Sequence, residues 1–140
     1  MTHPLVAAAR VCLGTPFHHQ GRVAGVGCDC AGLVLIAARA IGHHPPDSEG
    51  YGRMPKDGLL RDAVEQYLVP AADLVPGTVA LMQFETDVEP RHVAIVGDHP
   101  AGGLSLIHAY APARRVVEHA LDAAWQARIV ALYTLPDLHA

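Results

Sequence analysis

The stretch Gly27-Cys28-Asp29-Cys30-Ala31-Gly32-Leu33-Val34 holds the residues from which both the fold and the chemistry of this chain are predicted. From Cys30 onward, apolar residues recur at helical spacing as far as Ile41, and Gly42 follows as a typical helix stop. Asp29 is then the expected N-cap, with its carboxylate accepting hydrogen bonds from the free amides of the first turn. The pattern predicts a core helix that begins at the second cysteine.

Cys30 has two interpretations at the start of this helix. Unpaired backbone N–H groups and the positive end of the helix dipole favour the thiolate over the thiol. Both lower the pKa of a cysteine below its ordinary value of about 8.5. Cys30 would then be a nucleophile at neutral pH. In the other interpretation it is a small buried residue that starts a core helix. The stretch alone leaves both open.

The composition is that of a globular protein. The chain has 140 residues, of which 51% are hydrophobic and 17% charged, and a net charge of −4. We therefore expect a single domain over residues 1–140, with a core that needs no metal or disulfide. The acidic balance and the lack of basic runs argue against a nucleic-acid partner. No apolar stretch approaches the length of a membrane span, so no membrane partner is expected.

The N-terminal residues lack the basic start and long apolar run of a signal peptide. This predicts a protein that is made and kept in the cytoplasm, unless it is exported as part of a larger assembly.

The remaining cysteines and the ten histidines give little support for a metal or a cofactor. Cys12 falls on an apolar helical face and is expected in the core. Cys28 and Cys30 are too close in sequence for the usual zinc-ligand pair, and no second cysteine pair completes a site. The adjacent His43 and His44 have no ligand nearby at metal-site spacing. We expect neither metal nor cofactor, and a metal-binding module stays as a rival hypothesis.

The chain changes from helical to strand-like patterns near Pro76-Gly77. Helices are predicted over residues 4–13, 30–41 and 59–68, and strands over residues 78–84, 92–96, 104–110, 116–117 and 129–135. Helices followed by strands indicate an α+β fold, with N-terminal helices packed on a C-terminal antiparallel sheet. The loop over residues 14–27 leads into the cysteine helix and is expected to pass close to the thiol. The loop over residues 43–58 is either a cleft wall or a surface excursion.

Two histidines are expected to meet on this sheet. His92 begins one predicted strand and His108 lies near the end of the next. A hairpin centred on Pro100 pairs Gly97 with Gly103 and therefore places the two histidines opposite each other, with Cβ atoms roughly 4.5–5.5 Å apart. One imidazole can then act as a base while the other orients it, as cysteine nucleophilic catalysis requires. Alternatively, each histidine caps a strand or bonds a backbone carbonyl, and a bulge would break the pairing.

Five segments in chain order carry a resemblance that covers nearly the whole sequence. They are Gly14-Thr15-Pro16-Phe17, Asp29-Cys30-Ala31-Gly32-Leu33-Val34, Val75-Pro76-Gly77-Thr78-Val79-Ala80-Leu81, Arg91-His92-Val93-Ala94-Ile95-Val96 and Ile107-His108-Ala109. These segments resemble the motifs of the NlpC-type cell-wall peptidases, which are papain-like cysteine hydrolases. The run from Gly25 to Cys30 is especially similar to the branch associated with phage tails.

The resemblance implies a papain-like α+β fold and a role for each of three residues. Cys30 would be the nucleophile, His92 the general base and His108 its orienting partner. The implied activity is amide hydrolysis through a thioester, at the bond between D-glutamate and a diamino acid. The implied partner is therefore a peptidoglycan stem peptide, together with a phage-tail-like particle that would deliver the protein to the cell wall.

Phe17 stands where the family commonly has a tyrosine, whose hydroxyl helps to polarise the substrate carbonyl. Oxyanion stabilisation is then expected from the Cys30 amide with help from His18 or His19. Together with Asp29, these residues form the expected oxyanion or substrate-binding set. The missing hydroxyl also supports a rival, a non-catalytic structural component of a phage-tail-like particle. A closer rival keeps the Cys-His-His chemistry but acts on another amide or on an ester.

Overall fold

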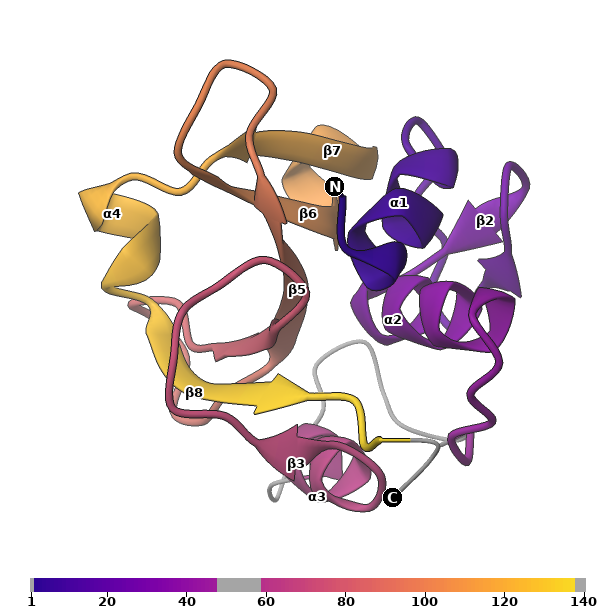
Figure 1. Ribbon diagram of the computed structural model, residues 1–140, viewed down its shortest axis with the longest axis horizontal. Coiled ribbons are helices and arrows are strands. Elements are labelled where there is room, and N and C mark those ends of the chain that lie inside the picture. Colours follow the sequence, from indigo (N-terminus) through magenta and orange to yellow (C-terminus); the bar gives the residue numbers. More distant parts are fainter. Residues whose placement is uncertain (1, 48–58, 138–140) are drawn as a thin grey trace.

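A six-stranded antiparallel sheet forms the centre of the computed structural model, which describes residues 2–47 and 59–137 (Figure 1). Across the sheet, the strands are β3 (Val69–Pro70), β8 (Ile129–Thr134), β4 (Val79–Met82), β5 (His92–Asp98), β6 (Leu104–Tyr110) and β7 (Arg115–Ala120). Each neighbouring pair is antiparallel. The predicted α+β fold class is confirmed.

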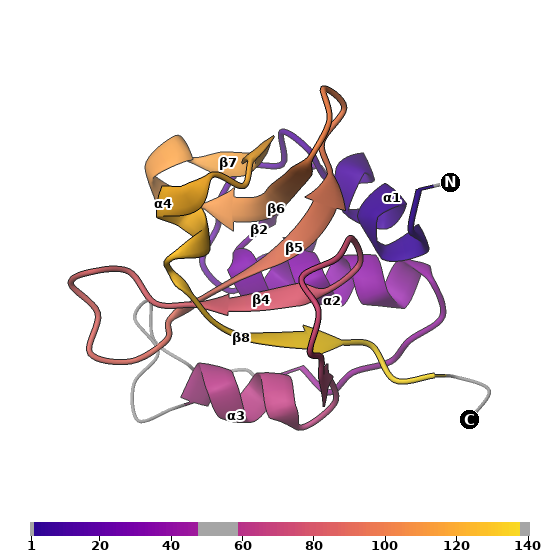
Figure 2. The same cartoon turned by 60° about the vertical axis from the view of Figure 1, so that its left-hand side comes forward.

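The N-terminal helices α1 (Pro4–Val11) and α2 (Cys30–Ala40) lie together on one face of this sheet, while α3 (Leu59–Glu65) lies near β3 (Figures 1 and 2). The loop between α1 and α2 contains a short antiparallel ribbon of β1 (Arg22–Val23) and β2 (Gly27–Cys28). A 3-10 turn, η1 (Ala111–Ala113), links β6 to β7, and α4 (Ala123–Gln126) links β7 to β8.

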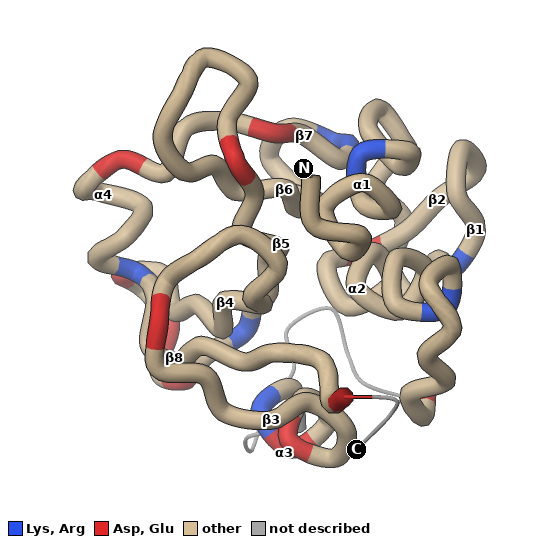
Figure 3. The backbone as a smooth tube through the Cα atoms, viewed as in Figure 1, with Lys and Arg blue, Asp and Glu red and all other residues tan. Residues whose placement is uncertain are grey.

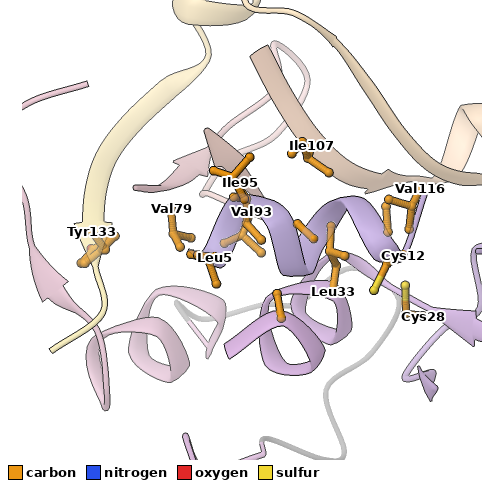
Figure 4. Packing of buried hydrophobic residues seen from close by; sticks show 14 of the residues in the cluster. Leu5, Cys12, Cys28, Leu33, Val79, Val93, Ile95, Ile107, Val116 and Tyr133 are labelled. Atoms are coloured by element: carbon orange, nitrogen blue, oxygen red, sulfur yellow. The ribbon is translucent and has the colours of Figure 1, made fainter. Parts of the chain in front are cut away.

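Buried apolar residues divide between the two faces of the sheet because side chains alternate along each strand. The helix-facing core joins α1 and α2 to β4, β5 and β6 (Figure 4) and includes Leu5, Ala9, Leu33, Ala37, Val79, Leu81, Val93, Ile95 and Ile107. A smaller cluster on the opposite face contains Ala80, Met82, Ala94, Val96 and Leu106, with Trp125 and Ile129 packed against it. The sheet is therefore covered on both faces.

The predicted elements are present with shifted bounds. The helix predicted over residues 59–68 ends at Glu65, and the strand predicted over residues 116–117 extends over Arg115–Ala120 as β7. β3, α4 and the β1–β2 ribbon were not predicted, since elements of two to four residues are too short to show a periodicity. Of the loop predicted over residues 43–58, residues 48–58 lie outside the described part of the chain.

The predicted register of the β5–β6 hairpin is wrong by two residues. Ile95 pairs with Ile107, whereas a turn centred on Pro100 would pair it with residue 105. Gly102 and Gly103 both adopt positive φ, at 105° and 79°, and so belong to the turn, whose centre moves toward the C-terminus. A shift of two keeps every side chain on its predicted face. The two histidines therefore share a face, but they do not lie opposite each other.

Acidic and basic residues are interspersed along the described chain, with no extended basic surface segment (Figure 3). Within residues 2–47 and 59–137, no helix combines the length and apolar character needed to cross a membrane.

Candidate active site

A pocket of about 410 Å³ lies where the start of α2 meets the beginning of β5 and the end of β6. Five of the seven residues that the sequence predicts for a site line this pocket: Phe17, His19, Asp29, Cys30 and His92. Three segments far apart in the sequence thus contribute to one cavity: the loop before the cysteine helix, the helix itself and a sheet strand.

The other two predicted residues lie elsewhere. His108 is completely buried behind His92 and reaches the pocket only through that ring. His18 is exposed, and its Nδ1 lies 3.1 Å from the carbonyl oxygen of His19 rather than in the pocket wall.

Asp29 caps α2, as predicted, and also fixes the loop that precedes it. Its carboxylate accepts a hydrogen bond from the Gly32 amide at 2.8 Å, which satisfies a free donor of the first helical turn. The same carboxylate accepts from the Gln20 amide at 2.8 Å and from the Arg22 guanidinium at 3.0 Å. One buried carboxylate therefore joins the loop to the helix start that carries Cys30.

Gly32 allows this loop to pass directly over the first turn of α2. A Cβ at this position would overlap the carbonyl oxygen of Gly21, and it would lie 3.0 Å from the Arg22 guanidinium. Backbone cannot move aside as a flexible side chain can, so the position requires glycine. This contact places the loop over the first turn of the helix that Cys30 starts, and Phe17 and His19 of the same loop line the pocket with Cys30.

The electrostatic environment of Cys30 disfavours the thiolate that one of the two interpretations required. Burial raises the pKa of Cys30 to about 11, and the negative charge of Asp29 acts in the same direction. The backbone N–H groups of Val93 and Ala31, which lie within hydrogen-bonding reach of the thiol, oppose this rise but do not overcome it. The helix start does favour the anion, but desolvation outweighs it, so the resting group is a thiol.

His92 is also neutral at rest, because burial lowers its pKa to about 4. The residue is 7% exposed, and its ring packs against Phe84 with ring centroids 5.4 Å apart. A neutral imidazole is the form that can accept a proton. The pocket thus contains a neutral thiol and a neutral imidazole.

His92 and His108 form a direct hydrogen bond, with Nε2 of His92 2.7 Å from Nδ1 of His108. Burial, followed by the charges of His92 and His119, lowers the pKa of His108 to about 2. His108 is therefore neutral, with one ring nitrogen that donates and one that accepts. Because this bond engages Nε2 of His92, Nδ1 is the ring nitrogen of His92 that remains.

His119 and the aromatic residues around the histidines are part of the site but were not predicted from the sequence. Nε2 of His119 lies 2.8 Å from Nε2 of His108. The Tyr110 ring stacks on His108, with centroids 5.1 Å apart, and the Trp125 ring lies 4.6 Å from that of His119. Extending the strand predicted over residues 116–117 by two residues would have placed His119 on the same face as His108.

The other two cysteines belong to the core. Cys12 and Cys28 are buried and form no disulfide bond, and their side chains lie close together (Figure 4). Burial raises the pKa of Cys28 to about 12. Of the three cysteines, Cys30 alone keeps partial exposure to solvent.

Among residues 2–47 and 59–137, no group of three or more His, Cys, Asp or Glu side chains is arranged to hold a metal ion.

Comparison with known proteins supports the fold at low sequence identity. No protein-family model and no curated protein sequence matches the chain. A lipoprotein-like NLP/P60 family protein from Staphylococcus aureus subsp. aureus Mu50 matches with a TM-score of 0.67 and 14% identity, over 96% of this chain and 41% of that one. The NlpC/p60 domain of the peptidoglycan hydrolase SagA matches with a TM-score of 0.61 and 21% identity, over 94% of this chain and 97% of that domain.

The chain therefore has the fold of NlpC/P60 proteins, as the sequence motifs predicted. It spans less than half of the staphylococcal structure but nearly all of the SagA domain.

Proposed function

We propose that this chain is a cysteine peptidase that hydrolyses peptidoglycan stem peptides at the amide between the γ-carboxyl of D-glutamate and a diamino acid. The observation that carries this proposal is the pocket shared by Cys30 and His92, with His108 hydrogen-bonded to His92 behind the pocket wall. The likeness in fold to a peptidoglycan hydrolase domain supports the choice of substrate.

The reaction would begin with attack of the Cys30 sulfur on the substrate carbonyl carbon. The thiol proton moves to Nδ1 of His92 as the carbon–sulfur bond forms. His92 then gives this proton to the departing amine, the carbon–nitrogen bond breaks, and a thioester remains. Water, deprotonated by His92, attacks the thioester and releases the carboxylic acid together with the restored thiol.

The negative oxygen that develops during attack needs hydrogen-bond donors. Cys30 is the first residue of α2, so its backbone N–H has no acceptor within the helix and can serve as one donor. Phe17 lines the pocket without a hydroxyl, and His19 is the imidazole of the preceding loop that lines it too. In this proposal His19 supplies the second donor, and His18 supplies none.

The charges around the pocket fit a peptide that bears both carboxylates and an ammonium group. Arg91 and Arg128 line the pocket together with Glu85 and Asp87. The Arg91 guanidinium lies 3.9 Å from the carboxylate of Asp87, and its Nε is buried with no hydrogen-bond partner. A substrate carboxylate would satisfy this donor, since buried donors are rarely left unpaired.

A synthetic L-alanyl-γ-D-glutamyl-diaminopimelate peptide tests the proposal, with products identified by mass spectrometry. The wild-type protein should release diaminopimelate and the L-alanyl-D-glutamate fragment. Cys30→Ala should release neither, whereas Cys12→Ala, which removes a buried thiol outside the pocket, should retain activity. Full activity of Cys30→Ala would remove the thiol as nucleophile.

Digestion of purified sacculi tests the rival hypotheses of a different substrate and of a non-catalytic role. Release of fragments cut at another amide, or hydrolysis of an ester with the γ-linked peptide untouched, would assign the same chemistry to a different substrate. A folded wild-type protein that is inert on all of these substrates would favour the non-catalytic role that Phe17 supports.

A further inference from the structure

We propose that His119 is a positioning residue that, acting through His108, fixes which nitrogen of His92 carries the proton and leaves Nδ1 free to act as the base. This rests on the proposed function for its consequence in catalysis, while the hydrogen-bond order itself can be measured without any substrate.

At the far end of this row of histidines, His119 faces a backbone carbonyl, a group that can only accept a hydrogen bond. Nδ1 of His119 lies 3.0 Å from the carbonyl oxygen of Ala120, so in the neutral ring Nδ1 carries the proton and Nε2 carries the lone pair. Nε2 of His108, 2.8 Å away, must then donate to His119. A backbone carbonyl thus sets the direction of the first hydrogen bond.

The hydrogen bond between His108 and His92 has its direction set in the same way. Because Nε2 of His108 carries its proton, Nδ1 of His108 accepts, and its partner 2.7 Å away, Nε2 of His92, donates. Nδ1 of His92 is left with a lone pair. The reverse order would place a proton on Nδ1 of His92, and a ring in that form cannot take the proton of the Cys30 thiol.

Without His119, nothing in this row selects one order over the other. Two neutral imidazoles can hydrogen-bond with the proton between them on either ring, and both orders satisfy the His92–His108 contact. His119 breaks this equivalence because it is tied to a carbonyl, in the way that a third group orients the base of other nucleophile–base pairs.

The surrounding side chains hold the three rings in this arrangement. The β6–β7 ladder pairs Leu106 with His119 and His108 with Val117, so the two histidines lie diagonally on one face. Trp125 packs against both rings, with centroids 4.6 Å from His119 and 5.3 Å from His108. This aromatic cover restricts rotation of the rings and keeps the row aligned.

Nitrogen NMR of the histidine rings tests the assignment directly, since protonated and unprotonated ring nitrogens differ widely in chemical shift. In the wild-type protein, His92 and His108 should carry the proton on Nε2, and His119 should carry it on Nδ1. A wild-type spectrum with the proton of His92 on Nδ1 would overturn the proposal, whatever the protein hydrolyses.

Two variants distinguish the role of His119 as a hydrogen-bond acceptor from its role in packing. His119→Leu removes the acceptor, so His92 and His108 should show a mixture of both proton positions, and kcat on the γ-glutamyl peptide should fall at least about tenfold with little change in KM. His119→Gln keeps an acceptor oxygen near the same place. This variant should show the wild-type proton positions on His92 and His108 and keep most of kcat. Unchanged proton positions in a folded His119→Leu would overturn the proposal.

The two proposals fail in different ways. A wild-type protein with the expected proton positions but no hydrolytic activity would support the order assigned here and reject the peptidase. If His119→Leu does not fold, the wild-type and His119→Gln spectra still decide the hydrogen-bond order.

Discussion

Nε2 of His92 lies 2.7 Å from Nδ1 of His108 although the two residues sit on a diagonal of the β5–β6 hairpin. Diagonal neighbours lie about 7–8 Å apart, with Cβ atoms somewhat closer, which leaves room for two imidazoles to meet nitrogen to nitrogen. The rings are accordingly tilted by 70°, with centroids 4.9 Å apart. The offset along the sheet places His92 at the pocket and His108 in the interior.

These buried neutral rings make the stability of the protein sensitive to acid. Burial lowers the pKa of His92 to about 4, whereas the pKa of histidine in the unfolded chain is about 6.5. Between these values the unfolded chain binds a proton that the folded chain does not, so the free energy of unfolding should fall as the pH is lowered through this window. One such group contributes up to about 1.4 kcal/mol per pH unit.

His92→Asn should reduce this slope, as measured by urea unfolding at a series of pH values. His44→Asn is the matched control, because His44 is exposed and the slope should stay as in the wild type. Equal slopes in His92→Asn and the wild type would show that His92 titrates alike in the folded and unfolded states.

Alkylation with iodoacetamide should modify one cysteine in the folded protein. Cys30 alone is partly exposed, whereas Cys12 and Cys28 are buried and should react only after unfolding. The rate at Cys30 should keep rising beyond about pH 9, because burial raises its pKa to about 11. Peptide mass mapping with Cys30→Ser as the blank gives the rate, and a plateau below neutral pH would instead indicate a thiolate–imidazolium pair at rest.

Asp29→Asn should separate the cap from the charge. Asparagine is a good N-cap and can still accept from Gly32, but the negative charge that raises the pKa of Cys30 is removed. Alkylation of Cys30 at a fixed pH should therefore become faster. Stability should fall by about 1–3 kcal/mol, because Arg22 loses the charge of Asp29 at 3.0 Å and keeps that of Asp47 at 3.2 Å. Slower alkylation of a folded variant would contradict the assigned effect of this charge.

Gly32→Ala should displace the loop that carries Phe17 and His19. The added Cβ meets the backbone of Gly21, so we expect a loss of about 1–3 kcal/mol in the free energy of unfolding and a fall in hydrolysis. Ala40→Gly, at the exposed end of the same helix, is the reverse exchange and should cost about 1 kcal/mol while leaving hydrolysis unchanged. Wild-type activity in Gly32→Ala would show that the loop yields without disturbing the pocket.

The parts that sequence reasoning predicted well depend on local patterns. The helix that starts at Cys30 and its Asp29 cap follow from apolar spacing and capping chemistry within about ten residues, and both are present. The segment motifs also led to the correct fold. The hairpin register was missed because Gly102 and Gly103 both enter the turn, and the sequence does not reveal which glycine will adopt positive φ.

The remaining errors concern features that depend on residues far apart in the sequence. The start of a helix favours a Cys30 thiolate, but burial by the rest of the chain raises the pKa of Cys30. His119 was missed because β7 has polar residues on both faces and shows a weak alternation. These two features depend on tertiary packing, which local sequence patterns do not contain.

The sheet order β3-β8-β4-β5-β6-β7 places the strand that is synthesised last of the six between two that are made earlier. On the ribosome, one edge of β4 therefore stays unpaired until residues 129–134 have emerged, although the histidine-bearing strands can already pair with each other. An unpaired apolar strand edge is a site for association with other chains. Translational stalling just before Ile129 should consequently yield chains that bind chaperones or aggregate, and completion of this one strand should end that exposure.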